Sequence, residues 1–178
     1  WKADEAAPAR EYLVGRGFSE DLLRSYGVGY APGAGAVLAA RAAKQGYQAR
    51  DLRDAGLARE RNGAVSDFFT SRIMFPIANG RGQVQGFGAR TLDPAERAKY
   101  VNSPEGRNFQ KRRLLFALDR ARVNGAKRGW IAVCEGYTDV IALAKAGFDN
   151  AVACMGTSLT TDQLRLLARA TDEVRLCF

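Results

Sequence analysis

The 178-residue sequence contains no histidine. This absence excludes a serine–histidine–aspartate or cysteine–histidine nucleophile, a histidine-ligated zinc and imidazole acid–base catalysis. Cysteine is scarce as well: Cys134, Cys154 and Cys177 lie far apart, each inside an apolar run. Their spacing is not that of a metal finger, and three thiols cannot form a closed set of disulfides. We therefore expect three buried thiols in a reducing compartment, and any chemistry must use carboxylates, cations, hydroxyls or an oxygen-ligated metal.

Long hydrophobic runs are also absent. No apolar stretch reaches the roughly 18 residues that a membrane-spanning helix needs. The first residues, Trp1-Lys2-Ala3-Asp4, do not resemble a signal peptide, and they lack an initiating methionine. The sequence is therefore expected to be a cytoplasmic fragment of a longer protein, with no membrane partner.

Positive charge is abundant, and it is concentrated in one segment. Lys and Arg number 27 against 19 Asp and Glu, which gives a formal net charge of +8. Residues 97–128 alone carry a net charge of +8, whereas residues 129–178 are net acidic. Polar side chains that can hydrogen-bond phosphates or bases, Tyr100, Asn102 and Ser103 among them, interrupt the basic run. The pattern favours a nucleic-acid or nucleotide surface over a merely solvated face.

Capping and turn residues divide the first 128 residues into short elements. We expect helices at residues 3–14, after an N-cap at Ser19, and at 36–44, 49–55 and 114–122. We expect strands at residues 28–30, 71–77 and 83–87. The last two strands would form a hairpin around the turn at residues 79–82, and residues 92–111 would form a polar loop.

The last fifty residues alternate more regularly. Apolar, β-rich runs at 130–134, 151–155 and 174–178 are separated by helical patterns at 137–146 and after Thr160 or Thr161. Such a β-α-β-α-β order predicts a sheet of buried parallel strands with right-handed crossovers. Ligands bind at the carboxyl ends of such strands. Glu135 would follow the first strand, and Gly156 and Thr157 would follow the second.

The acidic motif Glu135-Gly136-Tyr137-Thr138-Asp139 is the sharpest chemical signal. Asp139 lies about one helical turn after Glu135, so both carboxylates can face the same edge of the sheet. Two such groups suit Mg²⁺ or Mn²⁺, which bind a few carboxylates together with substrate phosphates. The spacing equally allows Asp139 to be a helix-stabilising acid and Glu135 a loop residue.

Further motifs precede the acidic motif and extend a resemblance over nearly the whole chain. The acidic motif and the segment 153–157 resemble a Toprim domain. The other motifs are those at residues 9–17, 29–32, 71–77, 86–90 and 99–104. In this order they resemble the catalytic core of bacterial DnaG-type primases. The resemblance implies an α/β fold: a mixed α/β N-terminal subdomain at 1–128 that includes the basic groove, then a partial Toprim sheet, parallel and Rossmann-like, at 129–178.

The resemblance also implies a function, namely DNA-templated synthesis of short RNA primers from nucleoside triphosphates during DNA replication. It implies a single-stranded DNA template as a partner, and the replicative helicase as a partner of a module outside this sequence. Glu135 and Asp139 would be catalytic and would hold Mg²⁺ or Mn²⁺. The expected nucleotide- and nucleic-acid-binding residues are Arg72, Arg90, Lys99, Tyr100, Asn102, Ser103 and Lys111.

Three departures from the family pattern stand out. In the family, arginines usually precede the strand expected at residues 71–77, but residues 67–71 contain none. Gly106 stands where the family usually has a threonine. Phe178 ends the sequence before the Asp-Gly-Asp motif that carries further metal carboxylates. The metal site is therefore expected to be incomplete and the fragment inactive alone. Two alternatives stay open: another Toprim enzyme, such as a topoisomerase or nuclease, and a non-catalytic nucleic-acid-binding module.

Overall fold

The computed structural model describes residues 1–33, 35–156 and 158–178. Its helices are η1 (Asp4–Ala6), α1 (Ala7–Gly15), α2 (Glu20–Ser25), α3 (Val37–Ala43), α4 (Ala49–Asp54), η2 (Lys111–Arg113), α5 (Leu118–Arg128), α6 (Tyr137–Lys145) and α7 (Thr161–Leu167). Its strands are β1 (Gly29–Ala31), β2 (Ala58–Arg61), β3 (Ala64–Asp67), β4 (Arg72–Ala78), β5 (Val84–Thr91), β6 (Tyr100–Asn102), β7 (Trp130–Cys134), β8 (Ala151–Ala153) and β9 (Glu173–Cys177).

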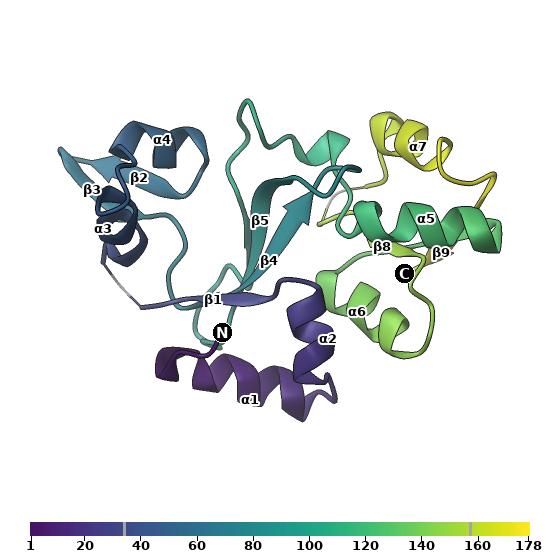
Figure 1. The fold of residues 1–178 in the computed structure, drawn as a ribbon, viewed down its shortest axis with the longest axis horizontal. Helices are drawn as coiled ribbons and strands as arrows, with labels where there is room; N and C mark the ends of the chain where they lie inside the picture. Colours follow the sequence, from purple (N-terminus) through teal and green to yellow (C-terminus); the bar gives the residue numbers. More distant parts are fainter. Residues whose placement is uncertain (34, 157) are drawn as a thin grey trace.

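Three sheets follow one another along the long axis of the molecule (Figure 1). A small lobe made of α3, α4 and the β2–β3 hairpin lies at one end. The central sheet has the order β1-β4-β5-β6 and is antiparallel throughout. At the other end, β8-β7-β9 form a parallel sheet. The α/β class, with a mixed N-terminal part followed by a parallel sheet, is thereby confirmed.

Strand β7, the central strand of the C-terminal sheet, is buried on both faces. Side chains alternate along a strand, and every position of β7 after its first residue is buried. Ile131 and Val133 pack into the cluster formed with α5 and α7. Ala132 and Cys134 belong to the other cluster, which contains residues of α6. An uninterrupted apolar strand is therefore what a sheet covered by helices on both sides requires.

The central sheet and the parallel sheet share one hydrophobic core. The Phe75 ring of β4 stacks on the Tyr137 ring of α6, with centroids 5.0 Å apart, and the Phe116 ring meets Tyr137 edge-on at 5.0 Å. All three side chains are at most 3% exposed. This aromatic packing holds the start of α6 against the central sheet, and the residues that follow β7 are positioned with it.

Helix caps that the sequence predicted are present. The Ser19 hydroxyl accepts a hydrogen bond from the Leu22 amide at 3.3 Å at the start of α2. Thr160, rather than Thr161, caps α7 by accepting from the Gln163 amide at 3.2 Å. The Gln163 side chain accepts in return from the Thr160 amide at 3.0 Å, which completes a capping box.

The β2–β3 hairpin was not among the expected elements, although its turn is recognisable. Asn62 and Gly63 connect the two strands, with φ angles of 51° and 76°. Two consecutive left-handed residues are the signature of the type I′ turn, which Asn-Gly favours because it matches strand twist. The strands themselves are short, polar and largely exposed, so their hydrophobic pattern carries no signal.

The expected strand at 83–87 is too short, because β5 continues to Thr91. Gly86 and Gly88 suggest a break, yet both positions are paired with β4. Their missing side chains make room for aromatic rings: a Cβ at Gly86 would overlap Phe109, and one at Gly88 would overlap Tyr137. The expected loop at 92–111 also contains a strand, β6, which pairs with β5.

The helix expected at 114–122 is shifted along the chain. Residues 114–117 are buried and non-helical, and Phe116 forms an isolated antiparallel bridge with Ala153. Ala117 has a φ of 63°, which turns the chain before α5 begins at Leu118. Residues 114–117 fit the helical pattern of the sequence, but they pack against β8 instead and do not join the helix.

The sequence predicted a buried third strand, but strand β9 is largely exposed. The expectation of three buried thiols is therefore wrong for Cys177. Cys134 and Cys154 are buried, whereas Cys177 is exposed. Within the described residues β9 pairs only with β7, so it lies at an edge of the sheet. Leu176 is 60% exposed, and of the β9 residues only Val174 packs against a core cluster.

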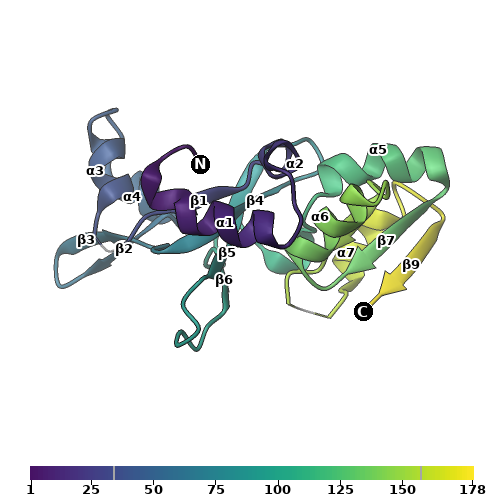
Figure 2. The same cartoon turned by 90° about the horizontal axis from the view of Figure 1, so that it is seen from below.

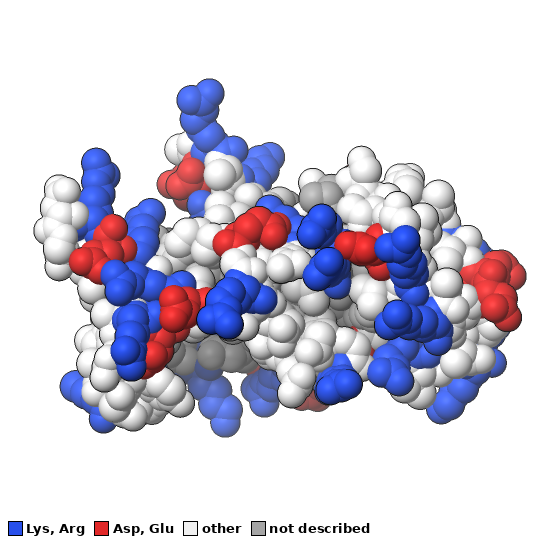
Figure 3. All heavy atoms as spheres, turned by 90° about the horizontal axis from the view of Figure 1, so that it is seen from above, with Lys and Arg blue, Asp and Glu red and all other residues white. Residues whose placement is uncertain are grey.

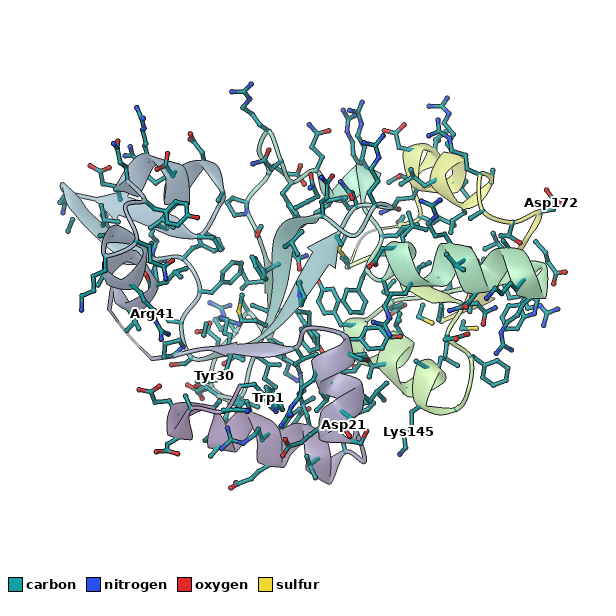
Figure 4. The ribbon with its side chains drawn as sticks, in the orientation of Figure 1. Trp1, Asp21, Tyr30, Arg41, Lys145 and Asp172 are labelled. Atoms are coloured by element: carbon teal, nitrogen blue, oxygen red, sulfur yellow. The ribbon has the colours of Figure 1, made fainter. Side chains whose placement is uncertain are left out.

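Helices α1 and α2 lie in front of the central sheet in Figure 2, and α2 contacts α6. Lys145, at the end of α6 and labelled in Figure 4, lies beside the turn between α1 and α2. A Cβ on Gly17 would approach the Lys145 Nζ to 2.8 Å, and Gly17 has a φ of 83°.

Among the helices formed by the described residues, none is long and apolar enough to cross a membrane.

Candidate nucleotide and nucleic-acid site

The acidic motif lies where strand β7 gives way to helix α6. Glu135 follows the last residue of β7, and Asp139 lies in the first turn of α6. Both side chains are exposed. The Asp139 Oδ2 accepts a hydrogen bond from the Gly136 amide at 3.1 Å, as the acidic partner at a helix start does. Asp139 thus stabilises the helix and keeps its other carboxylate oxygen available.

A cavity of about 510 Å³ opens beside Glu135. Gly156 and Ser158, which follow strand β8, line it, together with Cys154 and Phe178. The cavity therefore lies at the carboxyl ends of the parallel strands, where α/β folds bind ligands. Thr157, which the sequence placed at the same edge, lies outside the described residues.

Strand β6 is fastened to this edge by Asn102. The Asn102 amide donates to the Met155 carbonyl at 3.3 Å, just after β8. The Tyr137 hydroxyl donates to the Asn102 Oδ1 from the first residue of α6. One side chain thus joins the Lys99–Pro104 motif to both loops that follow strands β7 and β8. Two sequence motifs that are more than thirty residues apart become one site.

Tyr137 is a positioning residue that the sequence analysis did not select. Its side chain is 3% exposed, and burial raises the pKa of its hydroxyl well above the ordinary value of 10. A phenol that stays protonated is a hydrogen-bond donor, and this one donates to Asn102. The sequence did contain a signal for this role, because Tyr137 lies between Glu135 and Asp139 in the acidic motif.

Arg90 of β5 lies between two tyrosine rings. Its guanidinium carbon is 4.5 Å from the centre of the Tyr12 ring and 5.6 Å from that of Tyr100. The Nε and Nη1 atoms are buried, and neither has a hydrogen-bond partner among the residues that the structure describes. Stacking therefore orients the cation, while these two donors lie beneath the surface of the protein.

Arg72 and Ser103 lie beneath the surface and support the residues around them. The Arg72 side chain is 11% exposed; its Nη1 donates to the Ala98 carbonyl at 2.9 Å, and its Nη2 lies 3.6 Å from the Glu96 carboxylate. Ser103 is 1% exposed, and its hydroxyl accepts from the Phe87 amide at 2.9 Å. The Arg72 guanidinium holds the loop before β6, and the Ser103 hydroxyl holds the end of β6 against β5.

Lys99 and Tyr100 are exposed, whereas Lys111 is half-buried at the start of η2. The Lys111 carbonyl accepts from the Gln163 side chain at 3.0 Å, which ties η2 to α7. Among the described residues, no hydrogen bond or ion pair joins either lysine to Glu135 or Asp139. Figure 3 shows other parts of the basic surface, with Lys and Arg side chains distributed over the upper face.

Residues 1–33, 35–156 and 158–178 contain no group of three or more Asp, Glu, Cys or His that could hold a metal ion. The exposed Glu135 carboxylate has no hydrogen-bond or ion-pair partner among those residues, and Asp139 has one oxygen engaged by the Gly136 amide. Mg²⁺ is often held by one or two protein carboxylates plus phosphate and water oxygens. The chemistry of these two side chains fits such a role.

Accessibility of the cysteines can be checked by thiol labelling. Burial raises the pKa of Cys134 to about 12, and burial raises that of Cys154 as well. Fewer thiolates form near pH 8 when the pKa is raised, and the buried sulfurs also exclude the reagent. We expect Ellman's reagent to label only Cys177 quickly in the native protein and all three thiols in denaturant. Fast labelling that persists in Cys177→Ser would contradict this exposure pattern.

Comparison with known proteins first defines the class. Residues 129–178, which carry the acidic motif and the parallel sheet, match the Toprim domain family. Residues 1–122 match the family described as the DNA primase catalytic core, N-terminal domain. The chain therefore belongs to the DNA primase catalytic core family. A topoisomerase or nuclease with a Toprim domain does not account for the match over residues 1–122.

Individual relatives agree with this assignment. The DNA primase of Listeria innocua is 42% identical over 178 residues, which cover 99% of this chain and 28% of that protein. The RNA polymerase domain of Mycobacterium tuberculosis primase DnaG in complex with double-stranded DNA is 38% identical, with a TM-score of 0.94 over 99% of this chain and 58% of that chain. A DnaG primase catalytic domain bound to single-stranded DNA is 40% identical, with a TM-score of 0.87 and coverage of 99% and 55%.

Proposed function

We propose that this chain is the nucleotide- and template-handling part of a primase that makes short RNA primers on single-stranded DNA by metal-dependent nucleotidyl transfer. The chain covers 28% of the Listeria innocua primase, so the activity is proposed for the protein that contains these residues. The solved DnaG catalytic domain bound to single-stranded DNA and the domain bound to double-stranded DNA support a nucleic-acid partner.

The observation that carries the proposal is the attachment of Asn102 to the Toprim edge. Its hydrogen bonds to Tyr137 and to the Met155 carbonyl hold the exposed face of β6 beside the loop that starts with Glu135. A nucleotide bound along β6 would therefore have its phosphates near the acidic motif. Phosphoryl transfer depends mostly on such positioning and on charge stabilisation around the phosphates.

The proposed binding residues divide into those that can touch the ligand and those that support them. Lys99 and Tyr100 are exposed and can touch the ligand, Arg90 stacks on the Tyr100 ring, and Asn102 fixes strand β6. Arg72 and Ser103 hold the neighbouring backbone in place. Lys111 is proposed as a further cation for phosphate. Lysine acts as a compact point charge and arginine as a planar fork, so the two types complement each other around phosphate oxygens.

Glu135 and Asp139 are proposed to contribute ligands to Mg²⁺ or Mn²⁺, together with phosphate oxygens of the nucleotide and further carboxylates expected outside these 178 residues. The metal, when bound, neutralises charge on the phosphates and activates the attacking hydroxyl. Glu135 is free to bind through both oxygens, and Asp139 through the oxygen that does not accept from Gly136. The replicative helicase and a cytoplasmic location stay predictions of the sequence analysis.

Lys99→Ala tests the nucleic-acid face. Lys99 is exposed beside Tyr100, so its removal deletes a phosphate contact without disturbing the fold. The slope of log affinity against log salt for single-stranded DNA should become shallower by about 0.7. Fluorescence anisotropy with labelled oligothymidine measures this slope. Lys127→Ala, an exposed lysine on α5, is the matched control and should leave the slope unchanged. If the salt-dependence slopes of Lys99→Ala and Lys127→Ala are equal, Lys99 does not contact a phosphate of the bound DNA.

A further inference from the structure

A second cavity with a strongly basic lining lies away from the acidic motif. It measures about 380 Å³ and is enclosed by the β4–β5 turn, helix α5 and the end of helix α7. Arg81 of the turn, Arg122 of α5 and Arg169 after α7 line it, and Leu118 and Leu166 form its apolar part. None of the lining residues that the structure describes is acidic. Three cations from three elements thus line one cavity, together with Leu118 and Leu166.

Two of the three arginines are linked to an ordered β4–β5 turn. The Arg122 Nη1 donates to the Gly80 carbonyl at 2.7 Å, which joins α5 to the β4–β5 turn. The Asn79 side chain orders the same turn, because its Oδ1 accepts from the Arg81 amide at 2.9 Å and from the Gln83 amide at 3.2 Å. Arg81 therefore extends from an ordered turn.

Arg81 and Arg169 of this cavity lack the acidic partners that neighbouring arginines have. Close by on α7, Arg165 lies 3.3 Å from the Asp162 carboxylate, and Arg113 of η2 pairs with the same acid at 3.3 Å. The side chains of Arg81 and Arg169, by contrast, form no hydrogen bond or ion pair with any residue in the described ranges. Figure 3 shows basic side chains distributed along the upper face of the molecule, with acidic side chains among them. Converging unpaired cations repel one another, and an anion between them relieves that repulsion.

The cavity is separate from the proposed catalytic edge. The cavity beside Glu135 is lined by residues after β7 and β8, and the two cavities share no lining residue. Leu118 and Leu166 belong to the helices that cover the face of the parallel sheet opposite α6. A ligand bound here would therefore meet a different surface from a ligand at Glu135.

We propose that this cavity, formed by Arg81, Arg122 and Arg169, is a second binding site for the phosphodiester backbone of a nucleic-acid strand. The guanidinium groups would hold consecutive phosphates, and Leu118 and Leu166 would contact a sugar or base. A free nucleoside triphosphate is less suited to it, because such a ligand carries Mg²⁺ and the lining has no carboxylate to receive it. Phosphodiesters instead exchange monovalent counterions for arginines. The site goes beyond the proposed function, since it needs neither Glu135 nor a metal.

The test is binding of fluorescein-labelled oligothymidine to the 178-residue chain, measured by anisotropy over a range of about 50 to 200 mM KCl. In Arg81→Gln/Arg169→Gln the salt slope should fall by about 1.4, that is about 0.7 for each lost phosphate contact, with about tenfold weaker binding at the lowest salt. Arg59→Gln/Arg61→Gln is the matched control: it removes the same charge from two exposed arginines of β2. This control should keep the wild-type slope.

Two outcomes would overturn the proposal. One is an equal loss of affinity in the cavity variant and in the β2 control, which would reduce the effect to net charge. The other is a cavity variant that binds the oligonucleotide like the wild type but no longer binds ATP, which would make the cavity a free-nucleotide site. Thermal unfolding should show both variants folded.

Combination with Lys99→Ala separates this site from the proposed one. If the two surfaces bind different phosphates, the effects on log affinity should add. The cavity variant should also keep its deficit in the Lys99→Ala background even if Lys99 itself proves unimportant. A cavity deficit that disappears in that background would mean a single shared contact and would overturn the second site.

Discussion

Replacement of Glu135 by glutamine is expected to lower RNA primer synthesis by about 100-fold or more and to leave single-stranded DNA binding within about twofold. Glutamine has nearly the same shape as glutamate but lacks the negative charge that binds a divalent cation. Glu135 is exposed at the end of β7, and no described residue pairs with it, so the substitution should not disturb folding. Metal-dependent chemistry would fail while the basic surface persisted.

The assay needs a protein in which the whole catalytic core is present. A chimaera in which this chain replaces the matching residues of the Listeria innocua primase, 42% identical over 178 residues, provides it. Template-directed incorporation of labelled nucleotide would be measured over a range of Mg²⁺ and Mn²⁺ concentrations. Oligonucleotide binding would be measured on the same preparations.

Glu173→Gln is the control for the chemical change itself. Glu173 is an exposed carboxylate of β9 that pairs with Arg175 at 2.7 Å, and it lies outside the acidic motif. Primer synthesis should remain within about twofold of the parent, as expected for a surface ion pair. Unimpaired synthesis by the Glu135→Gln chimaera would refute the metal role. Parallel loss of binding and synthesis would instead assign Glu135 a structural role.

Replacement of Gly88 by alanine is expected to destabilise the fold by about 2–3 kcal/mol. A Cβ at this position of β5 would overlap the ring of Tyr137. That ring cannot move away freely, because it stacks on Phe75 and meets Phe116 inside the shared core. Any shift of Tyr137 would also loosen its hydrogen bond to Asn102, so DNA affinity should fall together with stability.

Urea denaturation followed by circular dichroism measures the effect. Gly29→Ala is the matched control, because Gly29 is also in a strand and a Cβ there would meet no atom within 4 Å. This control should change the free energy of unfolding by no more than about 1 kcal/mol, and an increase is the expected sign. Equal denaturation midpoints for the two variants would show that the Tyr137 contact does not require glycine.

Local patterns in the sequence predicted the elements whose signal is repeated along the chain. The parallel sheet followed from three apolar strands that alternate with helical patterns, and β7 indeed packs on both faces. The cap at Ser19, and a cap at Thr160 or Thr161 that the structure places at Thr160, followed from short side chains that accept backbone hydrogen bonds. These features depend on neighbours within a few residues, so a single sequence contains them.

Elements set by distant contacts were predicted less well. Strand β5 runs through Gly86 and Gly88 because the Phe109 and Tyr137 rings occupy the space of their side chains. Helix α5 begins late because Phe116 pairs with Ala153 of β8 instead. Cys177 is exposed because, of the β9 residues, only Val174 packs against a core cluster of the described residues. In each case packing between segments that are far apart in the sequence decides the outcome.

The candidate site shows the same division. The sequence alone determined which chemistry is available: no histidine, an acidic motif after a buried strand, and a basic segment with hydrogen-bonding side chains. Only the tertiary structure decided how these groups meet, because Asn102 reaches Tyr137 and Met155 across 35 and 53 residues. It also decided that Arg72 and Ser103 support the backbone while Arg90 stacks between two tyrosine rings. Side-chain types are local information, whereas burial and partners arise only when distant segments pack together.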